Sequence, residues 1–164
     1  MRRFFASRPA VLLLQLLVLF GAGALSFRAL AASPEPIMAG ELEISGYWVK
    51  AMLPGQPTGG GYLTVTNKGK EPDKLVSVSS GAAGMVELHK MEIVNDVMTM
   101  RPLDGPLEIP AGGSVAVDSS GGMHLMFMHV SEPFKQGGTV PLTLEFEKAG
   151  KVEVTLPVKK TADE

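Results

Sequence analysis

Short segments in which apolar and polar positions alternate recur along the chain after residue 40, and glycine, proline and other turn residues separate them. This period of two is typical of β-strands with one buried face. The predicted strands are Leu42–Ala51, Gly61–Thr66, Lys74–Ser79, Met85–Met91, Val97–Arg101, Leu107–Ile109, Ser114–Val117, His124–Val130, Thr139–Glu147 and Lys151–Val158. No segment keeps a helical period, so the pattern predicts an all-β protein built as an antiparallel sandwich or barrel.

Turn residues fix the ends of several predicted strands. Asn95-Asp96 predicts the turn of a hairpin, and Ala149-Gly150 joins the last two strands. The three glycines Gly59–Gly61 also predict a turn. They do not indicate a phosphate-binding loop, because the lysine and the serine or threonine of such a loop do not follow them. Pro34 and Pro36 prevent a helix ahead of the first strand.

The N-terminal segment has a different pattern from the rest. Arg2 and Arg3 precede an apolar run from Pro9 to Leu25, and Ala29-Leu30-Ala31 fits the small-x-small pattern of a cleavage site. This order predicts a secretory signal peptide over residues 1–32, with twin-arginine export or a retained membrane anchor as alternatives. Export would place the mature chain in a bacterial periplasm or outside the cell.

Composition narrows the class of protein further. Apolar residues make up 45% of the 164 residues, which is enough for a core, and 19 glycines and 12 prolines agree with many turns. Without the four arginines of residues 1–32, 11 basic residues stand against 17 acidic ones, a net charge of −6 that argues against nucleic acid as a partner. We therefore expect one β-sandwich domain over residues 33–158 and a charged tail over 159–164.

Soft metal ligands are concentrated in one part of the chain. All three histidines and six of the ten methionines lie between His89 and His129. Alternation along the predicted strands turns Leu125 and Phe127 toward the core and histidine and methionine to the opposite face. On three strands, the side chains predicted to lie opposite an apolar face are His89, Met91, Met98, Met100, His124, Met126 and Met128.

Methionine commonly fills irregular gaps in protein cores, and a lone histidine is most often a structural or surface residue. Neither use explains why histidine and methionine share a face on two strands. The chain has no cysteine, which excludes disulfides, iron–sulfur clusters and thiolate zinc sites. Neutral imidazole and thioether donors without thiolate or a carboxylate cage suit Cu(I), so the sequence predicts a Cu(I) site.

The same region resembles the PCu(A)C family of periplasmic copper chaperones. The family motif is a histidine, a methionine about eleven positions later, and a His-x-Met some twenty or more positions further on. It falls on His89, Met100, His124 and Met126, and the resemblance spans Gly46 to Val158. The gap from Met100 to His124 is slightly longer than the family spacing, and the chain lacks the His/Met-rich C-terminal tail that takes Cu(II) in some relatives.

This resemblance implies a Greek-key, cupredoxin-like β-sandwich that holds one Cu(I) near its surface through those four residues. It also implies delivery of copper to the dinuclear centre of cytochrome c oxidase, with a copper-accepting assembly protein or an oxidase subunit as partner. We expect a monomer without enzymatic activity, without a nucleic acid partner and without a stable membrane span in its mature form. The alternative is an exported binding or structural sandwich that stores copper or confers resistance without directed delivery.

Further residues are expected around the site, either behind the ligands or in place of one of them: Met91, Met98, Met123 and Met128. Met98 is the strongest alternate ligand because it shares a strand face with Met100. His129 has the opposite parity from His124 and is expected to be structural or solvated. Tyr47 and Trp48 are expected to pack at one end of the sandwich.

Two other copper proteins are excluded by the inventory of ligands. An electron-transfer cupredoxin needs a cysteine thiolate beside two histidines, and the chain has none. A multicopper enzyme needs more than the three histidines available, so we expect no catalytic residues.

Overall fold

The computed structural model describes residues 34–118 and 122–162. The predicted signal peptide and its alternatives lie outside these residues. The described residues form strands and no helix, so they contain no helix that could span a membrane. The strands are β1 (Ile37–Ala39), β2 (Leu42–Lys50), β3 (Thr58–Asn67), β4 (Asp73–Ser79), β5 (Ala83–Val94), β6 (Val97–Pro102), β7 (Leu107–Ile109), β8 (Ser114–Val117), β9 (Met123–Val130), β10 (Thr139–Phe146) and β11 (Gly150–Lys159).

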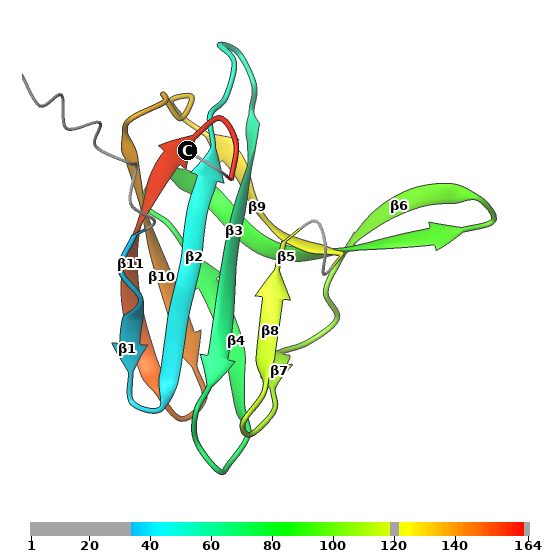
Figure 1. Ribbon diagram of the computed structural model, residues 1–164. Coiled ribbons are helices and arrows are strands. Elements are labelled where there is room, and N and C mark those ends of the chain that lie inside the picture. Colours follow the sequence, from blue (N-terminus) through cyan, green and yellow to red (C-terminus); the bar gives the residue numbers. More distant parts are fainter. Residues whose placement is uncertain (1–33, 119–121, 163–164) are drawn as a thin grey trace, which may run out of the picture. The chain divides into compact units, whose positions relative to one another are not determined.

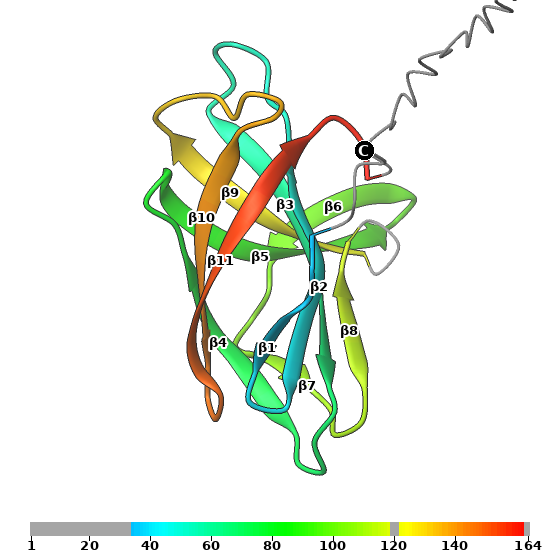
Figure 2. The ribbon, with the colours of Figure 1, turned by 60° about the vertical axis from the view of Figure 1, so that its left-hand side comes forward.

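The strands form one curled sheet in the order β6-β5-β9-β3-β2-β11-β10-β4-β7, with β1 beside β2 and β8 beside β3. All pairs are antiparallel except β2 with β11. Strands from opposite parts of this order, β4 and β5, are in contact, so the sheet closes over a core (Figures 1 and 2). The prediction of an all-β fold is confirmed.

Alternating positions of the strands fill that core. Leu125 and Phe127 of β9 are 0% exposed, as the alternation predicted. Side chains from both layers complete it, among them Ile44, Leu63, Ile109, Leu142, Leu144 and Leu156. Full burial of such a side chain contributes about 1.5–3 kcal/mol, so these strands hold the fold together.

The prediction of a turn at Gly59–Gly61 is wrong, because these glycines belong to β3. A Cβ at Gly61 would lie 2.8 Å from the ring of Phe127, and one at Gly59 would lie 3.0 Å from the ring of Phe134. The two rings pack edge to face with centroids 5.4 Å apart. The glycines therefore serve close packing of aromatic rings against the strand rather than a turn.

The hairpin of β5 and β6 extends beyond the rest of the sheet (Figure 1). Pairing of β5 with β9 ends at Lys90. The residues after it pair with β6, and the Met91 N–H also donates a hydrogen bond to the Gly122 carbonyl. Asn95 and Asp96 form the predicted turn with φ values of 52° and 62°, as in a two-residue type I′ hairpin. The expected apolar inner face of β6 is absent: Val97 is 59% exposed, because no second layer covers this part of the hairpin.

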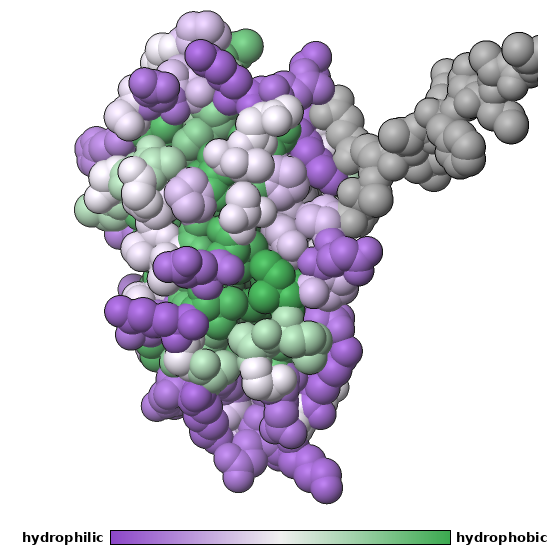
Figure 3. All heavy atoms as spheres, turned by 90° about the vertical axis from the view of Figure 1, so that its left-hand side faces the viewer, coloured by the Kyte–Doolittle hydropathy of each residue, from purple (hydrophilic) through white to green (hydrophobic). Residues whose placement is uncertain are grey.

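One end of the sandwich is polar, and Figure 3 shows hydrophilic residues gathered there, at the lower end of the view. Asp73 at the start of β4 is 4% exposed and accepts hydrogen bonds from the backbone N–H groups of Lys74, Lys148 and Ala149. Burial alone would raise the pKa of Asp73, but these hydrogen bonds and the Lys148 charge hold it below its ordinary value. The carboxylate thus ties the β10–β11 turn to β4.

Candidate metal centre

The register of three strands brings the predicted ligands onto one surface, the ligand face, made of the outward side chains of β5, β6 and β9. His89 of β5 lies opposite His124 of β9. Two residues further along β5, Met91 lies opposite Met100 of β6. On the other side of His89, Glu87 lies opposite Met126. Diagonal neighbours in such a ladder are about 7–8 Å apart at Cα, within reach of long side chains, so the four predicted ligands occupy adjacent positions.

A hollow of about 660 Å³ opens beside this face. His124, Met126 and Met100 line it together with Met91, which lies next to Met100 in the ladder. The remaining wall comes from β3 and from the end of β2 with the loop that follows it. Three of the four predicted ligands therefore share one solvent-accessible space, which we call the methionine hollow.

The fourth predicted ligand, His89, lies beside this hollow and next to His124. The ring centroids of the two histidines are 6.1 Å apart. His89 Nε2 lies 3.1 Å from Glu87 Oε2, a hydrogen bond whose direction depends on the tautomer. A carboxylate bonded to one ring nitrogen orients an imidazole and leaves the other nitrogen for a metal.

His124 is the more deeply placed of the two imidazoles, with 8% of its surface exposed. Burial, and then the nearby His89, lower the pKa of His124 below its ordinary value. The neutral imidazole is the form that binds a metal ion. The environment of His124 therefore favours the binding form at neutral pH.

The other methionines and the third histidine differ in position. Met123 packs against the hydrophobic core, on the face opposite the ligands. Met128 lies on the ligand face, opposite Met85, and does not line the methionine hollow. Met98 is 62% exposed and lies opposite Ile93, one step further out on the hairpin than Met100. His129 is exposed and has a φ of 54°, so it stands apart from His124, as its parity predicted.

Met52 lines the methionine hollow and was not predicted from the sequence. It lies in the loop between β2 and β3, and its sulfur is close to Gly59. A loop residue has no periodicity, and Met52 is 37 positions from His89. Only the pairing of β3 with β9 brings this loop beside Met126.

The chemistry of these donors fits Cu(I). Among the described residues, no three side chains of the His, Cys, Asp and Glu types are grouped so that they could hold a metal. Any metal bound on the ligand face would therefore depend on methionine sulfur in addition to imidazole. Thioether and imidazole donors match a soft monovalent copper ion and suit Mg²⁺ or Ca²⁺ poorly.

Known structures share this fold. The copper-bound PCuAC domain of PmoF2 superimposes with a TM-score of 0.65 and 25% identity, covering 78% of this chain and all of that domain. The Cu(I) form of DR1885 from Deinococcus radiodurans matches with a TM-score of 0.55 and 28% identity over 83% of this chain and 86% of its own. The apo form of DR1885 gives 0.58 and 25% identity, with coverage of 99% and 97%. The predicted cupredoxin-like fold is confirmed.

A sequence relative and a family model also match this chain. A putative lipoprotein of Leifsonia xyli subsp. xyli is 32% identical over 118 residues, which are 72% of this chain and 69% of the relative. The family model described as "Putative lipoprotein LpqE-like" matches residues 42–158, from the start of β2 to near the end of β11. The chain therefore belongs to the LpqE-like family and shares the fold of PCuAC domains, as its histidine and methionine motif predicted.

Proposed function

We propose that this protein is an exported Cu(I) chaperone that holds one copper ion through His89, Met100, His124 and Met126 and passes it to a partner protein. The observation that carries the proposal is the register of β5, β6 and β9, in which the two histidines are opposite each other and both methionines are adjacent. The position of the methionine hollow at the surface supports transfer, since an incoming ligand can reach a metal held there.

The donor set suits a carrier of Cu(I). Thioethers carry no proton, so only the two imidazoles compete with protons for the metal. A site without thiols also avoids disulfide formation in an oxidising compartment. Methionine ligands can still be oxidised to sulfoxides, which would weaken the site.

We propose the copper centre of cytochrome c oxidase, or an assembly protein that serves it, as the destination of the copper. The family resemblance supports this choice. Export to the periplasm is supported by the family description and by the Leifsonia xyli relative, both of which are described as lipoproteins. The lipid of bacterial lipoproteins is attached to a cysteine, and none of these 164 residues is a cysteine that could carry it.

A Cu(I) titration of residues 33–164 under reducing conditions tests the binding step. We expect one equivalent per chain, with sulfur and nitrogen neighbours in X-ray absorption spectra. A matched pair of variants, His124→Ala and His129→Ala, separates the two histidines of β9: only the first should lose binding. A copper shell of oxygen and nitrogen alone would contradict the site.

Storage without directed delivery is the second candidate function, favoured if the copper exchanges slowly. Stopped-flow transfer to a thiol-bearing acceptor distinguishes the two. Delivery predicts a transfer rate that rises with acceptor concentration, because the acceptor attacks the bound metal directly. Storage predicts a rate set by dissociation of copper and therefore independent of acceptor concentration.

A further inference from the structure

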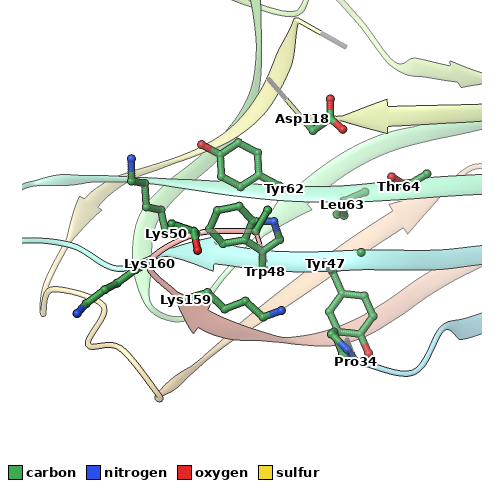
Figure 4. Close-up of a pocket in the computed structure, with 13 residues that line it drawn as sticks. Pro34, Tyr47, Trp48, Lys50, Tyr62, Leu63, Thr64, Asp118, Lys159 and Lys160 are labelled. Carbon is green, nitrogen blue, oxygen red and sulfur yellow. The ribbon is translucent and has the colours of Figure 1, made fainter. Parts of the chain in front are cut away.

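A second concave surface lies next to the methionine hollow, on the outer face of β2, β3 and β11. Its volume is about 550 Å³. Trp48 and Tyr62 stack there with ring centroids 4.6 Å apart and planes inclined at 31°. Figure 4 shows the two rings together, with Lys50 alongside and Lys159 beneath Trp48. We call these four residues the aromatic shelf.

An irregularity in β2 turns Trp48 to this outer face. Leu42 and Ile44 face the core, and regular alternation would turn Trp48 inward with them. The pairing with β3 shifts by one position between Ser45 and Trp48, where Gly46 has a φ of 57°. This bulge reverses the alternation, so Tyr47 is buried instead of Trp48. Of the two residues expected to pack, Tyr47 therefore packs in the core, and Trp48 packs against Tyr62 on the outer face near the end of β2.

The charges on the aromatic shelf are of one sign, and the ammonium groups of Lys50 and Lys159 extend to different sides of the ring pair (Figure 4). Lys50 and Lys159 are direct partners in the parallel pairing of β2 with β11, where strands are about 4.8 Å apart. Neither lysine side chain forms an ion pair with another described residue. Each lysine is therefore available to bind a carboxylate of its own, one on either side of the rings.

The described part of the lining has an excess of positive charge. Among the described lining residues, three lysines stand against one carboxylate, Asp118. Lys160 extends away from the ring pair in Figure 4, so Lys50 and Lys159 are the cations that face the aromatic shelf. The chemistry that fits is a carboxylate beside an apolar or aromatic group, because ammonium groups bind the first and the exposed ring faces bind the second.

The aromatic shelf is continuous with the methionine hollow, since Lys50 and Tyr62 line both. A protein that receives copper must bring its own metal ligand to the hollow, and this requires contact with the surface around it. Tryptophan and tyrosine are the side chains that most often dominate binding energy at protein interfaces.

We propose that the aromatic shelf is the docking surface for an acidic segment of the protein that exchanges copper with this chain. The carboxylates of that segment bind Lys50 and Lys159, and an apolar side chain covers Trp48 and Tyr62. The identity of the occupant as a copper partner rests on the proposed function, whereas the chemistry of the surface does not.

Trp48 is the single tryptophan of the chain, so its fluorescence reports directly on the aromatic shelf. The first experiment titrates metal-free protein with a nonapeptide rich in glutamate and leucine, and in parallel with the same peptide carrying glutamine for glutamate. We expect a saturable change in Trp48 emission for the glutamate peptide, weakened by salt, and at least tenfold weaker binding of the glutamine peptide.

The double variant Lys50→Gln, Lys159→Gln should weaken binding of the glutamate peptide by about tenfold or more. Lys151→Gln is the matched control, because Lys151 lies near the other end of β11 and loses the same charge. An equal response to both peptides, or a double variant that binds like the Lys151→Gln protein, would overturn the proposal. So would a Trp48 response to phosphatidylglycerol vesicles in the absence of any response to the glutamate peptide.

The second experiment measures copper transfer to a synthetic dithiol peptide flanked by glutamates or by glutamines. We expect faster transfer to the glutamate-flanked acceptor, and an equal rate for both acceptors in the double lysine variant and in Trp48→Leu. If the protein binds no copper but still binds the glutamate peptide, the proposed function fails and the docking surface stands. If the unchanged protein transfers copper to both acceptors at the same rate, the docking surface is contradicted and the proposed function stands.

Discussion

The body of the sandwich and the outer part of the β5–β6 hairpin show opposite relations between side chains and solvent. In β2, β3, β10 and β11, nearly every second residue is buried. In the hairpin beyond Lys90, both faces are exposed, and Ile93, Met98 and Met100 are 73%, 62% and 54% exposed. The hairpin contributes a proposed copper ligand and almost nothing to the core, so stability and metal binding should depend on largely separate residues.

The largest effect on stability should come from the body. Phe127→Ala removes a fully buried ring that packs on Phe134 and Gly61, and it should lower the free energy of unfolding by about 3–5 kcal/mol. The double variant His124→Ala, Met126→Ala changes the neighbouring outward positions and should cost much less. Urea denaturation of both proteins checks this. If the double variant were the less stable one, the division of β9 into core and ligand faces would be wrong.

A smaller effect is expected at the polar end. Asp73→Asn removes the charge that accepts three backbone hydrogen bonds and should cost about 1.5–3 kcal/mol. Because the pKa of Asp73 is lower in the folded protein than in the unfolded one, its contribution is complete above about pH 4 and disappears as the pH falls through the folded value.

Denaturation curves between pH 2 and pH 7 test the assignment to Asp73. The Asp73→Asn protein should lose less stability on acidification than the unchanged chain. Glu71→Gln is the control, since Glu71 is exposed at the same end and its ion pair with Lys148 should contribute little. Equal acid sensitivity of the Asp73→Asn protein and the unchanged chain would assign the effect to another carboxylate.

The hairpin should separate copper binding from stability. Met100→Leu keeps the apolar volume and removes the sulfur, so Cu(I) affinity should fall at least about tenfold, equivalent to about 1.4 kcal/mol, while stability changes by less than about 0.5 kcal/mol. Met98→Leu makes the same change on the same face of β6 and should leave affinity nearly unchanged. Competition with a Cu(I) chelator measures both. A greater loss of Cu(I) affinity in the Met98→Leu protein than in the Met100→Leu protein would identify Met98 as the ligand in place of Met100.

The smallest effect is expected at the tip of the hairpin. Ile93→Ala should change the free energy of unfolding by less than about 0.5 kcal/mol, because its side chain is already in solvent. Ile44→Ala removes the same atoms from a position that is 0% exposed and should cost about 2–5 kcal/mol. Similar costs for the two variants would show that the hairpin tip is covered in solution.

The sequence by itself determined the elements and the chemistry. A period of two along each strand is a local property, so it predicted the strands, the core-facing Leu125 and Phe127, and the placing of His124 and Met126 on the other face, where they line the methionine hollow. The type of donor atom is also local, and it pointed to Cu(I) before any neighbour was known. Residues that share these properties, such as Met98 and Met100, could not be ranked in this way.

Only the tertiary structure decided which side chains meet. The register of β5 with β9 places His89 opposite His124, and the approach of a loop adds Met52, which no periodic pattern indicates. The Gly46 bulge turns Trp48 outward, against the alternation of β2. The physical reason is that strand pairing, bulges and loop approach depend on contacts between residues far apart in the chain, and a local pattern of polarity carries no information about them.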